Sequence, residues 1–182
     1  MKSLCLTLFL FCQTTFNNFD FTYSTKEEFI QGIADCTVLS NTFIPPPQRV
    51  IILISVGQAA LESNWGNSRF AREGNNFYGV IETDPTSKHL KALGDPKIMI
   101  RVYEKNCESV ADYIRILNSH PNFKEYQDLL VTQYISGNVD PLSVVKTLHS
   151  YAVDPYYVEK LIKMMSSLLK EYPHLFKVSH PV

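Results

Sequence analysis

The sequence predicts one mostly helical α+β domain with a small β-sheet portion. Most of the chain consists of segments whose apolar residues recur at helical spacing. Two short runs near the middle are rich in β-branched and aromatic residues, as strands are. No repeat, linker or low-complexity block divides the 182 residues, which are enough to bury one substantial core.

The first dozen residues have the outline of a secretory signal peptide, with Lys2 followed by a short apolar run. That run is too short to span a bilayer. No small-x-small cleavage site follows it, so an ordinary apolar N-terminal segment is the alternative. We expect residues 1–24 to be a leader and residues 25–182 to form the domain. We expect no stable membrane span in the mature chain.

The first helix of the domain is predicted over Thr25–Asp35, where Phe29, Ile30 and Ile33 share one face. Three consecutive prolines then break the chain and can open a second helix over Gln48–Asn64. This second segment is apolar nearly all round. It is therefore predicted to be a buried central helix rather than a surface one.

The β-sheet portion is predicted to follow a turn at residues 74–76. The two expected strands are Phe77–Glu82 and Lys97–Tyr103, joined by a long loop that contains prolines and a glycine. Apolar residues at helical spacing then predict four further helices. These are Glu108–Asn118, Phe123–Tyr134, Leu142–Tyr151 and Tyr156–Tyr172.

The charge balance argues against nucleic acid as a partner. Seventeen basic and 18 acidic residues are mixed along the chain and give a net charge of −1, whereas phosphate binding needs a concentrated basic face. Cys36 and Cys107 form either one disulfide or two buried thiols. Neither has a neighbour at metal-ligand spacing, so we expect no metal ion and no cofactor.

Glu62 is the first candidate for chemistry, because it ends a helix that is otherwise apolar. A carboxylate is costly there unless it is paired or protonated, and partial burial raises its pKa. A raised pKa suits a general acid that works near neutral pH. The alternative is a helix-end glutamate that faces water. Trp65, three residues later, offers an apolar face to a sugar ring or belongs to the core.

Three ordered blocks resemble a known family of enzymes. The segment 58–79, with Gln-Ala-Ala-Leu-Glu-Ser-Asn-Trp-Gly at its start and Glu-Gly-Asn-Asn-Phe-Tyr-Gly at its end, resembles the signature of glycoside hydrolase family 73. These are bacterial peptidoglycan N-acetylglucosaminidases. Residues 151–157 resemble the family's Tyr-Ala-Thr-Asp-Pro-x-Tyr. Blocks within 101–121 are most similar to the Bax-type bacterial branch, and the resemblance covers roughly residues 48–165.

The resemblance implies a lysozyme-like fold, in which a helical lobe and a β-hairpin lobe enclose a glycan cleft. It implies that Glu62 is the general acid for the bond after N-acetylglucosamine. Tyr151 then positions the acetamido group or stabilises charge, unless its ring is simply part of the core. Substrate contacts are expected from five more residues: Trp65, Asn76, Phe77, Tyr78 and Tyr156. The expected partner is the peptidoglycan glycan strand, bound by a periplasmic or extracellular monomer.

The second catalytic group is left open. Glu82 is the best-placed candidate, with Asp84 and Glu104 weaker, and each is otherwise an ordinary solvated charge. If no carboxylate faces Glu62, the substrate's own acetamido oxygen can act as nucleophile, assisted by Tyr151. An inverting route with water activated by Glu82 competes with it. A lytic transglycosylase or muramidase on the same fold, or a non-catalytic module that binds wall glycan, are the alternative functions.

Overall fold

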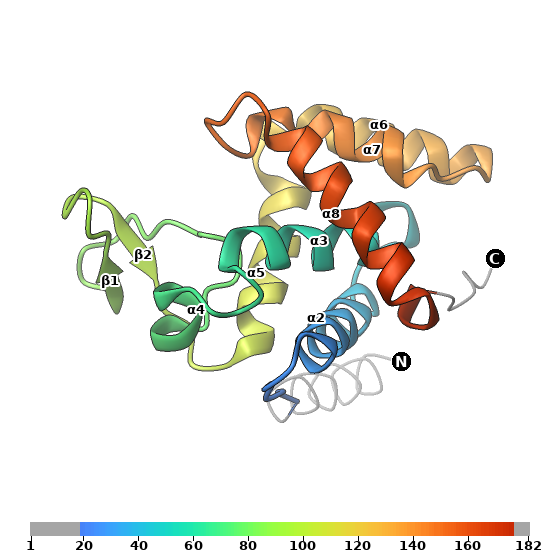
Figure 1. Cartoon of the computed structure of the whole chain (residues 1–182). Helices are drawn as coiled ribbons and strands as arrows, with labels where there is room; N and C mark the ends of the chain where they lie inside the picture. Colours follow the sequence, from blue (N-terminus) through green and yellow to red (C-terminus); the bar gives the residue numbers. More distant parts are fainter. Residues whose placement is uncertain (1–18, 177–182) are drawn as a thin grey trace, which may run out of the picture.

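The structure is a computed structural model that describes residues 19–176 (Figure 1). Most of the predicted leader lies outside these residues. A group of helices forms the body, and a two-stranded hairpin lies to one side of it, next to a short helix (Figure 1). The elements of the first half are α2 (Lys26–Asn41), η1 (Pro46–Gln48), α3 (Ile52–Ser63), α4 (Arg69–Gly74), β1 (His89–Lys91) and β2 (Met99–Arg101).

The second half is entirely helical within the described residues. Its elements are α5 (Asn106–Ser119), η2 (Pro121–Phe123), α6 (Lys124–Ser136), α7 (Pro141–Lys146), η3 (Thr147–Ser150), α8 (Tyr157–Glu171) and η4 (Pro173–Phe176). The four expected helices are all present. The expected helix 142–151 is divided, however, because Leu148 leaves helical geometry and the last turn tightens to a 3₁₀ turn.

Helix α3 forms the centre of the fold, as its apolar sequence predicts. It packs against α2 on one side and α8 on another, and every residue from Leu53 to Ala60 is buried. It begins at Ile52 rather than at Gln48. Pro46 and Pro47 instead open the short 3₁₀ turn η1, and the backbone at Arg49 and Ile51 is extended before α3 starts.

The expected strand Phe77–Glu82 is wrong. The hairpin is formed by β1 and β2, paired antiparallel with Leu90 opposite Ile100. The earlier segment contributes only an isolated bridge between Ile81 and Ile100. Its aromatic residues do not alternate between two faces of a sheet. Phe77 and the residue after it are both drawn into the helical core, and Gly79 then turns the chain with a left-handed φ of 68°.

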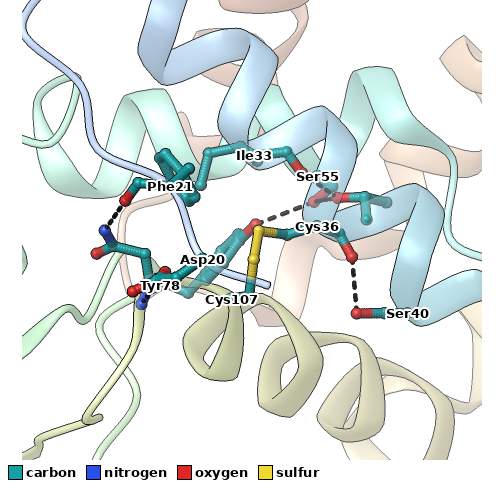
Figure 2. Close-up of a disulfide and its surroundings, with 10 residues drawn as sticks. Asp20, Phe21, Ile33, Cys36, Ser40, Ser55, Tyr78 and Cys107 are labelled. Carbon is teal, nitrogen blue, oxygen red and sulfur yellow. Dashed lines mark hydrogen bonds between the residues drawn. A yellow bond between two sulfur atoms is a disulfide. The ribbon is translucent and has the colours of Figure 1, made fainter. Parts of the chain in front are cut away.

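Cys36 and Cys107 form a disulfide, which decides between the two alternatives that the sequence left open (Figure 2). Their Cα atoms are 5.3 Å apart, and the bond joins the middle of α2 to the first turn of α5. Beside it, the hydroxyl of Ser55 on α3 bonds the hydroxyl of Tyr78 at 2.9 Å. The disulfide thus joins two helices of the body, and the buried Ser55–Tyr78 bond fixes that body to the segment that follows α4.

Residues just before the expected domain start at residue 25 pack on the helical body. Phe21 packs so closely on α2 that a Cβ at Gly32 would lie 2.0 Å from its ring. The Phe21 carbonyl accepts a hydrogen bond from the Asn106 side chain at 2.6 Å (Figure 2). Tyr23 lies edge-on to Phe29, with ring centroids 5.2 Å apart. Phe21 and Tyr23, within the expected leader, thus contact the helical body.

Candidate functional site

Glu62 lies in the last turn of α3, directly before a tight turn that the motif Glu-Ser-Asn-Trp-Gly builds. Asn64, Trp65 and Gly66 all have left-handed backbone, with φ of 50°, 58° and 74°. The Ser63 hydroxyl donates to the Ala59 carbonyl at 2.6 Å and accepts from the Gly66 N–H at 2.7 Å. A Cβ at Gly66 would lie 2.5 Å from the Tyr23 ring. The turn is thus rigid and tolerates only glycine at its end.

The Glu62 side chain is half-buried, and this burial raises the pKa of its carboxyl above the ordinary value. A hydrogen bond with the Tyr157 hydroxyl opposes part of that rise, because it favours the ionised form. The Glu62 carboxyl therefore retains its proton to higher pH than the carboxyl of a solvated glutamate does. When it ionises, the Tyr157 hydroxyl stabilises the carboxylate.

A buried relay of side chains leads to this carboxyl. The Tyr113 hydroxyl donates to Gln58 Oε1 at 2.5 Å, and Gln58 Nε2 donates to the Tyr157 hydroxyl at 2.7 Å. Gln58 is fully buried and precedes Glu62 by four residues, so both lie on one face of α3. Sequence reasoning missed this relay. Its signal was a polar residue one turn before the acid in an apolar helix.

Tyr151 lies against Tyr157, with ring centroids 5.4 Å apart and the rings nearly parallel. Its hydroxyl donates to the carbonyl of Tyr78 at 2.9 Å. Burial is the main reason that the pKa of Tyr151 is raised well above its usual range, and the negative charge of Glu62 adds to it. The charge of Glu62 therefore acts on the Tyr151 phenol, which stays protonated.

The Glu82 carboxylate already accepts hydrogen bonds from two backbone N–H groups and from Arg101. The donors are the N–H groups of Thr83 and Asp84, at 2.9 and 3.0 Å, and Arg101 Nε, at 2.8 Å. The Asp84 N–H and then the guanidinium hold the pKa of Glu82 below its ordinary value. Arg101 also pairs with Asp112 at 2.6 Å. Glu82 is thus an ionised carboxylate held by Arg101 on β2, and Arg101 in turn ties the hairpin to α5.

The two weaker candidates for a second acid also differ from Glu62. Hydrogen bonds from Thr86 are the main reason that the pKa of Asp84 is lowered. Glu104 is exposed at the loop before α5. Neither has the half-buried environment that Glu62 has.

Three of the expected substrate contacts lie in the core, which corrects that expectation. Phe77 has no exposed surface, and Asn76 and Tyr78 are each 2% exposed. The Asn76 amide donates to the carbonyls of Val80 and Arg101, so it fastens the loop after α4 to β2. Buried side chains cannot touch a sugar in this conformation.

The other two expected contacts remain accessible. Trp65 is half-buried in the turn after α3, and Tyr156 is 63% exposed just before α8. In residues 19–176, no group of three or more His, Cys, Asp or Glu is arranged to hold a metal ion. No helix in that range is long and apolar enough to cross a membrane.

Residues 48–170 match a protein-family model named Glucosaminidase and described as mannosyl-glycoprotein endo-beta-N-acetylglucosaminidase. The exo-glucosaminidase LytG of Bacillus subtilis is 30% identical over 135 residues, which are 68% of this chain and 44% of that protein. The peptidoglycan hydrolase FlgJ of Escherichia coli K12 is 28% identical over 127 residues, 62% and 38% of the two chains. The chain thus spans less than half the length of these relatives.

Two solved structures have the same fold. The catalytic domain of the autolysin Auto from Listeria monocytogenes aligns with a TM-score of 0.61 and 19% identity, over 92% of this chain and 94% of that one. The glycoside hydrolase domain of Salmonella typhimurium FlgJ aligns with a TM-score of 0.62 and 23% identity, over 85% and 94%. These likenesses confirm the mostly helical, lysozyme-like fold with a small hairpin.

Proposed function

This chain belongs to the glucosaminidase family, glycoside hydrolase family 73, and we propose that it hydrolyses the β-1,4 bond after N-acetylglucosamine in peptidoglycan glycan strands. The observation that supports this most directly is the raised pKa of Glu62 at the end of a buried helix. The name of one relative, a peptidoglycan hydrolase, supports the choice of substrate.

In the proposed reaction Glu62 is the general acid. Its carboxyl donates a proton to the glycosidic oxygen as the bond from that oxygen to C1 of N-acetylglucosamine breaks. The Tyr157 hydroxyl then stabilises the carboxylate that is left, because it already interacts with this group. Glu62 takes a proton back from the water that completes hydrolysis, so the enzyme returns to its starting state.

For the second step we propose that the substrate supplies the nucleophile. Glu82 is held by two backbone N–H groups and by Arg101, which makes it a weak base for activating water. The carbonyl oxygen of the 2-acetamido group attacks C1 instead and forms a cyclic oxazolinium ion. Water opens that ion with retention of the β configuration. Tyr151, whose ring lies against that of Tyr157, is proposed to orient the acetamido group in this step.

The remaining parts of the proposal concern the setting of the protein. We propose that the chain acts on the cell wall in the periplasm or outside the cell, and as a monomer. A signal peptide within the first dozen residues would direct its export, and that segment lies outside the described residues. Export is tested by comparing the mass of the protein recovered from the periplasm with that of the full chain.

The test of the reaction uses the purified chain, Glu62→Gln, Glu82→Gln and the control Glu159→Gln, whose side chain is exposed on α8. Each protein is incubated with peptidoglycan, and the released sugar ends are identified by mass spectrometry. We expect reducing N-acetylglucosamine ends from the wild type. Glu62→Gln should lose about 10²- to 10⁴-fold in rate, as removal of a general acid does. Glu159→Gln should match the wild type.

The same products separate the alternatives. Anhydromuramic ends would identify a lytic transglycosylase, and reducing muramic ends a muramidase. Binding of strands without turnover would identify a glycan-binding module. NMR of the first-formed anomer tests the second step, because retention supports the acetamido nucleophile. An inverted product together with a loss of rate in Glu82→Gln would instead make Glu82 the base.

A further inference from the structure

A pocket lies beside the turn that follows Glu62, and Glu62 does not line it. It has a volume of about 560 Å³ and lies between the segment that leads into α2, the turn after α3, and one side of α4. Its walls include the cationic side chains of Lys26 and Arg72, the ring of Trp65 and the amide of Asn67.

The two cations have no acidic partner in the part of the chain that the structure describes. Lys26 Nζ lies 4.6 Å from the centroid of the Trp65 ring, and Arg72 donates to Asn67 Oδ1 at 2.7 Å. Arg69, on the same short helix, differs because it pairs with Glu73 at 3.2 Å. The pocket therefore presents two positive charges whose attraction for an anion is not already satisfied.

Two carboxylates that bond residues lining the pocket are used by backbone groups. Asp20 accepts the N–H of Asn106 at 2.9 Å, and Glu28 accepts the N–H groups of Ser24 and Thr25 at 2.7 and 3.0 Å. These bonds direct both carboxylates to the backbone. The two cationic side chains of the pocket are therefore available to bind an anionic ligand.

The aromatic wall of the pocket is held firmly in place. Trp65 has a left-handed backbone, and the turn on either side of it is fixed by Ser63 and by the Tyr23 hydroxyl, which donates to the Gly66 carbonyl at 2.9 Å. An indole that carries Lys26 over its ring and shares the pocket with Arg72 suits a ligand that combines carboxylates with short apolar groups.

The pocket is also near the proposed acid. Three Cα–Cα steps of about 3.8 Å place the Cα of Trp65 within about 11 Å of the Cα of Glu62. We infer that this pocket binds the carboxylates of the peptide stem that hangs from the muramic acid of the wall glycan. This inference rests on the proposed substrate, and it names a part of that substrate which the glycosidic reaction does not need.

Trp65 is the only tryptophan of the chain, so its fluorescence reports directly on the pocket. The purified chain is titrated with the tetrapeptide L-Ala-γ-D-Glu-L-Lys-D-Ala, with the same peptide amidated at its carboxyls, and with N-acetylmuramic acid. We expect a saturable change with the tetrapeptide and a much weaker one with its amide. Lys26→Gln and Arg72→Gln should each weaken binding about 2- to 5-fold, as expected for exposed charge pairs.

Lys124→Met is the matched control, because this exposed lysine pairs with Asp128 on α6, outside the pocket. It should bind the tetrapeptide as the wild type does, and so should Glu62→Gln. A response that is absent, or equal for the amide, overturns the inference. A response to N-acetylmuramic acid but not to the tetrapeptide also overturns it, because the lactyl carboxylate would then be the ligand.

The two proposals fail separately. If the wild type cuts glycan strands but Trp65 does not respond to the tetrapeptide, the pocket assignment is wrong and the hydrolase stands. If the tetrapeptide binds in both the wild type and Glu62→Gln but no sugar ends are released, the pocket assignment stands and the hydrolase is wrong.

Discussion

The Tyr157 hydroxyl accepts a hydrogen bond from Gln58 Nε2 at 2.7 Å, and Gln58 Oε1 accepts one from the Tyr113 hydroxyl at 2.5 Å. With the amide in this orientation, the proton of Tyr157 is left for donation to Glu62. A tyrosine on α5 is thus connected through Gln58 to the group that contacts the acid on α3.

Tyr157→Phe should raise the pKa of Glu62 further, because it removes the hydrogen bond that favours the ionised form. The alkaline limb of the pH–rate profile should move to higher pH, and kcat should fall about 10-fold because the ionised acid loses its partner. Tyr134→Phe is the control, since that tyrosine is 45% exposed on α6. An alkaline limb that stays in place, or moves to lower pH, contradicts the proposed effect of the Tyr157 hydroxyl on Glu62.

Glu62→Gln should make the protein more stable at neutral pH. The folded pKa of Glu62 is raised above its unfolded value, so ionisation of this group opposes folding. That cost is absent below the unfolded pKa and is complete once the pH exceeds the folded pKa. Urea unfolding at pH 7.5 and pH 3.5 measures this, with Glu159→Gln as control. The prediction is contradicted if the free energy of unfolding of Glu62→Gln exceeds that of the wild type by the same amount at both pH values.

The sequence was sufficient for those features that depend on one helix and its pattern. The burial of α3 follows from its apolar residues on all sides, and Glu62 at its end stood out as a polar exception. The relay needed tertiary contacts, because Gln58 and Tyr157 are 99 residues apart in sequence. Composition does not show which tyrosines meet a glutamine in the core.

The error at Phe77–Glu82 has a related cause. A run rich in aromatic and β-branched residues favours a strand, but burial of Phe77 against Phe29, with centroids 5.5 Å apart, draws the segment into the helical core. The ring of Tyr23 packs on the same cluster. Tertiary packing overrode local strand preference in this segment.

Asn64→Ala should destabilise the protein by about 1 kcal/mol, because Asn64 has a left-handed backbone that alanine adopts only at a cost. Asn64→Gly should be close to neutral, since glycine enters this region without strain. Thermal unfolding of the two variants measures the difference. Equal melting temperatures for the alanine and glycine variants would show that the backbone at this turn can relax.

Arg101→Met should destabilise the protein by about 2 kcal/mol at pH 7, because Glu82 loses a partner while mostly buried. The folded pKa of Glu82 is lowered, so its stabilisation is present above the unfolded pKa and is lost as the pH falls through the folded value. The difference from the wild type should therefore shrink at pH 2.5. Lys124→Met, which breaks an exposed pair, should cost under about 1 kcal/mol at both pH values. A cost for Arg101→Met that is independent of pH contradicts the assignment.

Reduction of the Cys36–Cys107 bond should destabilise the protein by about 4 kcal/mol, because the bond closes a loop with a sequence separation of 71 residues in the unfolded chain. Urea unfolding with and without a reductant measures this. The double variant Cys36→Ala/Cys107→Ala is the control, and reductant should leave its midpoint unchanged. The bond joins α2 to α5, and α2 packs on α3, whose last turn carries Glu62. Reduction should therefore lower the temperature at which activity is lost while leaving kcat at 25 °C unchanged. A wild-type midpoint that does not respond to reductant would show that the two thiols are not bridged in solution.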